Sequence, residues 1–277
     1  MDRETLAAAE DLDALGALAV ELADGAAELI RDTAGSQLAV GSKSTDTDLV
    51  TDVDRRVESW LVGQLRKRRP GDAVLGEEGG DRMAKSGGAA VRWVLDPIDG
   101  TVNFVLGLPQ FAVSVAAEVG GAVLAGAVAN PVTGETFHAR RGGGAFCGTQ
   151  RLHGPRDLPL ERAVVATGFA YDAATRARQV AVVAPLLPRV ADIRRLGAAA
   201  LDLCFVAAGR LDAYFEAGLH SWDYAAGALI AAEAGCVLSG LRNRPPSPHL
   251  LAVTGPGMAA DFFALLEEVD ADEVSTR

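Results

Sequence analysis

One stretch of the sequence organises the rest: Trp93-Val94-Leu95-Asp96-Pro97-Ile98-Asp99-Gly100-Thr101-Val102-Asn103-Phe104. The short, mostly apolar run at 91–95 is typical of a buried strand. Pro97 is expected to end this strand, because proline cannot donate to a sheet ladder and holds the preceding residue extended. Gly100 then allows a tight turn or a close backbone approach. Asp96 and Asp99 are therefore predicted to follow a strand end, on irregular backbone.

These two carboxylates and a free carbonyl in the same turn, such as that of Ile98, form an oxygen-only set of ligands. A set of this kind suits Mg²⁺ or Mn²⁺ better than zinc. Thr101 adds a hydroxyl beside them. A plain polar turn would explain the pentapeptide alone equally well, because Asp, Pro and Gly are common turn residues.

The composition is that of a globular protein. The chain has 277 residues, of which 49% are hydrophobic and 23% are charged. This length suits one large domain or two coupled ones. We expect one compact unit with an N-terminal half (1–150) that carries most of the acidic candidates and a C-terminal half (151–277) that carries Asp223.

The formal net charge of -11 argues against nucleic-acid and anionic-membrane partners, which need a basic face. An anionic substrate stays possible, because bound metal ions would invert the local field. The N-terminus shows no signal-peptide pattern, and no apolar stretch is long enough to span a bilayer. The cysteines, Cys147, Cys204 and Cys236, are odd in number and widely spaced, which indicates neither a disulfide framework nor a zinc site. We therefore expect a cytoplasmic protein.

Hydrophobic periodicity predicts the remaining elements. In the first half we expect helices at 4–32 and 48–69, strands at 73–75, 111–118, 122–129 and 135–139, and loops at 34–46 and 81–90. In the second half we expect strands at 163–167, 193–196, 211–216, 236–238 and 250–253, and helices at 173–184, 198–207, 222–234 and 258–269. Ser221 is the candidate N-cap of the third of these helices. The glycine run 142–144 lacks a Lys-Ser/Thr ending and a following helix, so it predicts a turn between strands.

Four acidic clusters stand at loop or helix starts: Asp54, Glu77, Asp96 with Asp99, and Asp223. Each one alone is more often a solvated residue or a helix cap. Asp52 and Asp54, for example, lie near a predicted helix start, where carboxylates interact well with the helix dipole. Together, the four clusters could converge at one edge of the sheets.

Five segments carry a specific resemblance. They are Gly76-Glu77-Glu78, the central stretch 93–104, Trp222-Asp223-Tyr224-Ala225-Ala226-Gly227, and the segments 48–54 and 195–202. In order and rough spacing they resemble the signatures of the inositol monophosphatase family, part of the Mg²⁺-dependent, lithium-sensitive phosphatase superfamily. The similarity covers about residues 40–270.

The resemblance implies an α+β fold, a layered αβαβα sandwich, usually in a homodimer. It also implies Mg²⁺-dependent hydrolysis of small phosphate monoesters by metal-activated water, with two or three ions. Glu77, Asp96 and the Ile98 carbonyl resemble the ligands of one ion, and Asp96, Asp99 and Asp223 those of a second. Glu77 would also help to hold a third ion through water.

By the same resemblance, Thr101 with Glu77 and Asp54 behind it orients and deprotonates the attacking water. Gly100 and Thr101 would offer backbone N–H groups to the phosphate. The implied substrate contacts are Ile98, Asp99, Gly100, Thr101, Gly197, Ala198, Ala199, Glu216, Asp223 and, as a nearby basic residue, Lys43. Ala198 departs from relatives that have Ser or Thr there, so a hydroxyl contact is missing. The Pro-rich segment 239–249 looks short.

Several functions stay open. The first is hydrolysis of inositol monophosphate or a similar polyol phosphate. The second keeps the chemistry on histidinol phosphate, fructose 1,6-bisphosphate or the 3′-phosphate of adenosine 3′,5′-bisphosphate. The third is a regulatory binding protein that has kept the fold, although every inferred ligand is present.

Overall fold

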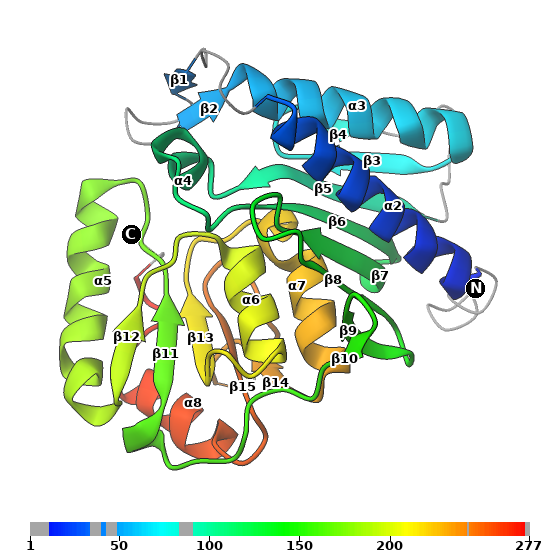
Figure 1. Cartoon of the computed structure of the whole chain (residues 1–277). Helices are drawn as coiled ribbons and strands as arrows, with labels where there is room; N and C mark the ends of the chain where they lie inside the picture. The colour runs from blue at the N-terminus through cyan, green and yellow to red at the C-terminus, as the bar shows by residue number, and fades with distance from the viewer. Residues whose placement is uncertain (1–10, 34–39, 43–48, 83–90, 243, 275–277) are drawn as a thin grey trace.

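Five layers make up the molecule in the computed structural model, which describes residues 11–33, 40–42, 49–82, 91–242 and 244–274 (Figure 1). Helices α2 and α3 cover one face of a large sheet, α6 and α7 lie between the large sheet and a small one, and α5 and α8 cover the outer face of the small sheet. The helices are α2 (Leu12–Arg31), α3 (Asp52–Arg68), α4 (Thr101–Leu106), α5 (Ala173–Leu186), α6 (Ala199–Ala207), α7 (Ser221–Glu233) and α8 (Ala259–Glu268), with 3-10 turns at Leu160–Arg162 and Leu187–Arg189. The expected α+β, αβαβα sandwich is confirmed.

The large sheet has eight strands in the order β10-β9-β8-β7-β6-β5-β3-β4. They are β3 (Ala73–Gly76), β4 (Gly80–Arg82), β5 (Arg92–Asp99), β6 (Ala112–Val119), β7 (Ala122–Ala129), β8 (Thr136–Arg140), β9 (Gly144–Cys147) and β10 (Gln150–Arg151). Only β3 and β5 pair in parallel. The predicted antiparallel strands and the glycine turn between β8 and β9 are confirmed. Two further strands, β1 (Val40–Ser42) and β2 (Leu49–Thr51), pair with each other.

The small sheet has five strands in the order β12-β11-β13-β15-β14. They are β11 (Val164–Thr167), β12 (Asp192–Arg194), β13 (Ala213–Glu216), β14 (Val237–Ser239) and β15 (Leu251–Thr254). Strands β12, β11 and β13 are parallel to one another, so the residues that follow them meet at one edge of the sheet. This edge becomes one wall of the site described below.

Apolar side chains fill the spaces between the layers. Trp93 and Val115 of the large sheet pack with Leu22 and Leu61 of the outer helices. Both faces of β5 and β6 are buried, which explains why residues 93–95 of β5 and most of β6 are apolar. Within the described part of the chain, no helix combines the length and apolar character that crossing a bilayer requires.

The prediction that Pro97 ends the central strand was wrong. Strand β5 continues to Asp99, and its register with β6 shifts between the pairs Asp96↔Ser114 and Asp99↔Ala112. The shift places one extra residue on β5, which makes a β-bulge. A bulge tolerates proline because the residues inside it do not need a ladder hydrogen bond.

Two predicted helix starts were also wrong. Helix α3 begins at Asp52 rather than at residue 48, because Thr51 caps it: the Thr51 hydroxyl accepts from Val53 N–H at 3.1 Å, and Asp54 Oδ2 accepts from Thr51 N–H at 2.8 Å. Residues 49–51 form β2 instead. Ser221 is the first residue of α7, whose N-cap is His220. Residues 4–10 of the first predicted helix, and 34–39, 43–46 and 83–90 of the predicted loops, lie outside the described residues.

Candidate active site

A cavity of about 380 Å³ opens where the end of β5 faces the parallel edge of the small sheet. Its volume lies in the range of small-molecule sites. One wall comes from the large sheet and α4, and the opposite wall from the residues after β11, β12 and β13. The lining includes Glu77, Asp96, Ile98, Asp99, Gly100, Thr101, Gly168, Phe169, Ala170, Tyr171, Asp172, Arg195, Gly197, Ala199, Glu216, His220, Trp222 and Asp223.

Three carboxylates meet on one side of the cavity. Asp96, Asp99 and Asp223 each offer an oxygen, and these oxygens lie within 4.8 Å of one another. Asp96 and Asp99 are only 1% and 8% exposed. Backbone N–H groups orient them: Ile98 donates to Asp96 Oδ1 at 3.0 Å, and Ala200, in the first turn of α6, donates to Asp99 Oδ2 at 2.7 Å. His220 N–H donates to Asp223 Oδ2 at 2.6 Å.

Electrostatics explain what such a cluster needs. Burial, followed by the charges of Glu77, Asp99 and Asp223, raises the pKa of Asp96 well above its ordinary value. Burial and the charge of Asp223 do the same to the pKa of Asp99. Ionised carboxylates packed this closely away from water repel one another unless a cation sits between them. The donor set consists only of oxygen atoms, so it fits a hard divalent cation.

Thr101 links this cluster to a buried acid. Its Oγ1 lies 3.1 Å from Asp54 Oδ1 and 3.0 Å from the Ile98 carbonyl. Asp54 is fully buried behind Thr101 and also forms the cap of α3 with Thr51. Burial raises the pKa of Asp54, against the hydrogen bonds from Thr51, which lower it. The cap that starts α3 therefore also fixes the carboxylate behind Thr101.

Two glycines allow the backbone to pack closely beside the acidic cluster. Gly100 has φ of 90°, and a Cβ there would lie 2.9 Å from the Gln110 carbonyl oxygen. Gly197 has φ of 88° and faces Gly100 through its own carbonyl. Asn103 ties the two segments together, because its Nδ2 donates to the carbonyls of Gln110 at 2.6 Å and Leu196 at 2.8 Å. The large sheet and the start of α6 are thereby held at a fixed separation.

The opposite wall centres on Glu216. The Tyr214 hydroxyl, fully buried, donates to Glu216 Oε2 at 2.7 Å. Burial raises the pKa of Glu216, while this hydrogen bond and the charge of Arg195 lower it. Arg195, from the end of β12, lines the same wall. This wall thus offers hydrogen-bond acceptors and a cation to an uncharged, hydroxyl-bearing group.

The structure brings most of the predicted site residues together. Glu77, Asp96, Ile98, Asp99, Gly100, Thr101, Gly197, Ala199, Glu216 and Asp223 all line the cavity, with Asp54 directly behind. Ala198 does not line it: it is 1% exposed and packs into the core below Gly100. Lys43 lies outside the described residues.

Sequence reasoning missed several contributors. Helix α4, Asn103 as a link, Tyr214 behind Glu216 and residues 168–172 on the rim were not predicted. Asn103 lies within the stretch 93–104, so its closeness in sequence to Asp96 and Asp99 could have indicated a role at the site. Residues 168–172 carry no motif, and only the parallel edge of the small sheet brings them to the cavity.

Comparisons with known proteins agree with this geometry. Residues 11–269 match the model of the inositol monophosphatase family. The inositol-1-monophosphatase of Mycobacterium leprae is 47% identical over 275 residues, which cover 93% of this chain and 94% of the relative. The Nus factor SuhB of Pasteurella multocida is 40% identical over 83% of this chain and 86% of its own. The solved structure of the extragenic suppressor protein suhB of Bartonella henselae has a TM-score of 0.86 and 33% identity, covering 92% of this chain and 99% of that one. This chain therefore belongs to the inositol monophosphatase family and is a phosphatase of that family.

Proposed function

We propose that this phosphatase hydrolyses inositol monophosphate to inositol and phosphate, using Mg²⁺. The observation that carries the proposal is the convergence of Asp96, Asp99 and Asp223 within 4.8 Å in a cavity that also holds Thr101. The similarity to the inositol-1-monophosphatase of Mycobacterium leprae supports the choice of substrate.

The residues that would hold the cation are those three aspartates, with Glu77 and the carbonyl of Ile98 beside them. Two or three ions would share these ligands, and Mn²⁺ would fit the same oxygen set. When bound, Mg²⁺ supplies Lewis-acid polarisation of the phosphoryl oxygens and lowers the pKa of water. Neutralising the carboxylates also allows an anionic ester to enter a protein of net charge -11.

Thr101 and Asp54 would orient and deprotonate the attacking water. Asp54 accepts the hydroxyl hydrogen of Thr101, which leaves the lone pairs of Thr101 Oγ1 to accept a hydrogen bond from water. As the water attacks phosphorus, the bond from phosphorus to the inositol oxygen breaks. The water proton passes to Thr101 Oγ1, the Thr101 proton passes to Asp54, and the departing inositol oxygen takes up a proton from solvent. The raised pKa of Asp54 suits it to this acceptor role. Glu77 would assist from the other side of the cluster.

The remaining contacts would position the ester. The first turn of α4 leaves the backbone N–H groups of Gly100 and Thr101 without intrahelical partners, so they can donate to phosphoryl oxygens. Asp99, Ile98 and Asp223 border the phosphate on the cation side. Glu216 would accept from a hydroxyl of the alcohol, and Gly197 and Ala199 would contact its ring.

The test is phosphate release from myo-inositol 1-phosphate and histidinol phosphate, each with Mg²⁺ and with EDTA. We expect Mg²⁺-dependent, lithium-inhibited release from the inositol ester and little from the other. The reverse preference would overturn the substrate while keeping the chemistry. Fructose 1,6-bisphosphate and adenosine 3′,5′-bisphosphate complete the panel.

A homodimer is the proposed assembly. Leu106 and Leu108 are 67% and 46% exposed at the end of α4, and Val132 is 56% exposed. The Asn130 side chain donates to the Pro109 carbonyl at 3.1 Å, which links the two segments that carry these exposed apolar residues. Light scattering on the protein and on a Leu106→Glu variant checks this: we expect a dimer that the variant weakens.

A partner-binding role is the second candidate, favoured by the similarity to the Nus factor SuhB of Pasteurella multocida. Co-purification of a protein partner with a phosphatase-inactive Asp99→Asn variant would support it as a separate activity. The free state of Cys147, Cys204 and Cys236 fits the reducing cytoplasm that we propose for the protein.

A further inference from the structure

The rim of the cavity includes one short connection, residues 168–172, which we call the rim loop. It joins β11 to α5, and all five of its residues line the cavity. Phe169 and Tyr171 bring aromatic rings to the wall of the cavity that carries Glu216, which we call the alcohol side. A connection this short, without a sheet or helix ladder of its own, must find other partners for its backbone polar groups.

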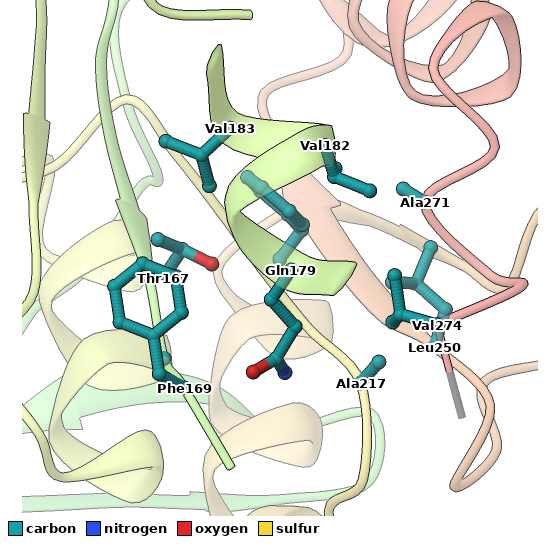
Figure 2. Close-up of a pocket in the computed structure, with 11 residues that line it drawn as sticks. Thr167, Phe169, Gln179, Val182, Val183, Ala217, Leu250, Ala271 and Val274 are labelled. Carbon is teal, nitrogen blue, oxygen red and sulfur yellow. The ribbon is translucent and has the colours of Figure 1, made fainter. Parts of the chain in front are cut away.

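Gln179 provides one of these partners from beneath. It lies on α5, is 5% exposed, and its Oε1 accepts from Ala170 N–H at 2.8 Å. Figure 2 shows its side chain extending from the helix so that the amide lies between Phe169 and Ala217. The surrounding residues, including Val182, Phe215 and Leu250, leave about 10 Å³ of free space. That is room for about one water molecule, so the amide has little freedom to move away.

Arg176 of α5 and Asp172, the last residue of the rim loop, add further contacts between the helix and the loop. Arg176 Nη1 lies 3.1 Å from the Ala170 carbonyl and 2.7 Å from the Tyr171 carbonyl, to which it donates. Asp172 is the N-cap of α5 and accepts from Thr175 N–H at 2.7 Å. The helix therefore pairs with the backbone of the loop at both its N–H and C=O groups.

The rim loop also fixes where the Glu216 side chain lies. A Cβ on Gly168 would lie only 1.9 Å from Glu216 Oε2, so the loop backbone packs directly against this carboxylate. Tyr214 holds the same oxygen from the other side. Because Glu216 lies between the two, a shift of the loop changes where Glu216 can meet a hydroxyl.

We propose that Gln179 and Arg176 are positioning residues that set the alcohol side of the cavity through the rim loop. They select phosphate esters of cyclic polyols, whose ring fills the space up to Glu216 and Phe169, over esters of small linear alcohols. The inference rests on the proposed function, because it concerns the alcohol part of the same substrates.

The test compares KM and kcat for myo-inositol 1-phosphate and glycerol 2-phosphate in wild type and in Gln179→Leu. Leucine is similar to glutamine in size but is apolar, so it removes the acceptor for Ala170 N–H. We expect KM for the inositol ester to rise about tenfold, because the rim loop loses the hydrogen bond that fixes its backbone beside Glu216. Values for glycerol 2-phosphate and the Mg²⁺ dependence should stay unchanged. Gln179→Glu keeps the acceptor oxygen and should restore the wild-type preference, and Gln150→Leu, at an exposed position on β10, is the matched control.

Arg176→Met tests the same point from a less buried position, should Gln179→Leu fold poorly. It should raise the same KM and leave glycerol 2-phosphate turnover intact. Equal losses on both esters, or an unchanged KM ratio in both variants, would overturn the positioning role while leaving the phosphatase activity established. A wild-type protein that releases phosphate from neither ester with Mg²⁺ would overturn the proposed function and this inference together.

Discussion

Asp96 and Asp99 lie three residues apart on one bulged strand, whereas Glu216, Arg195 and Gly168 reach the opposite wall from three different strand ends. The first group is held by backbone N–H groups and is nearly inaccessible to water. The second depends on side chains such as Tyr214 and Gln179 that lie outside the cavity or beneath its rim.

With this arrangement, residues on one wall of the cavity can govern the chemical step while residues on the other wall govern substrate selectivity. Changes on the side of Asp96 and Asp99, which we call the phosphate side, should alter turnover for every ester, because all substrates share the phosphoryl group. Changes on the alcohol side should alter KM for some esters only. Four predictions follow from this difference, and they are given in order of decreasing effect.

Asp99→Asn should have the largest effect on activity. We expect kcat/KM to fall about 1,000-fold on every ester, roughly 4 kcal/mol, because the shared cation position loses a charged ligand. Phosphate release measured across a Mg²⁺ titration checks this, with Asp261→Asn at an exposed position on α8 as the control. Full activity at limiting Mg²⁺ would contradict the assignment of Asp99.

Asp54→Asn should lower kcat about 100-fold on every ester and leave the Mg²⁺ dependence unchanged, because it removes the proton acceptor behind Thr101. Thr51→Ala separates this role from helix capping. It should cost about 1 kcal/mol of unfolding free energy but retain much more activity. If the two variants lose activity in proportion to stability, Asp54 is only a cap.

Asn103→Ala should lower the stability of the protein, because the Asn103 side chain links the segments on the two sides of the cavity. Removing its amide leaves the carbonyls of Gln110 and Leu196 without this donor, and we expect a loss of about 2 kcal/mol in urea unfolding. Asn103→Asp should destabilise the fold further, since it places a carboxylate against two carbonyl oxygens. An unchanged unfolding free energy in both would show that the two sides are held apart by other contacts.

Glu216→Gln should have the smallest effect and the most selective one. Losing the charged acceptor should raise KM for inositol 1-phosphate about fivefold, with kcat for glycerol 2-phosphate retained. Steady-state kinetics on both esters provide the measurement, and Glu161→Gln, at an exposed position, is the control. A uniform fall in kcat would place Glu216 on the phosphate side and break the comparison.

The acidic side of the cavity could be predicted from the sequence alone. Asp96, Asp99 and Thr101 are close in the chain, and the signatures around Glu77 and Asp223 have a recognisable order. The buried strands of the large sheet were also readable, because runs that are apolar on both faces leave a strong pattern. Local chemistry sufficed wherever the interacting residues were neighbours or carried a motif.

The other features depend on how strands and helices pack against one another. The bulge at Pro97 depends on the pairing of β5 with β6. The alcohol side depends on the parallel edge of the small sheet, which brings Gly168, Arg195 and Glu216 together from strands far apart in the chain. Contacts such as that of Gln179 with Ala170 N–H leave no spacing pattern in the sequence, because what places them is the packing of a helix against a sheet edge rather than the chain between them.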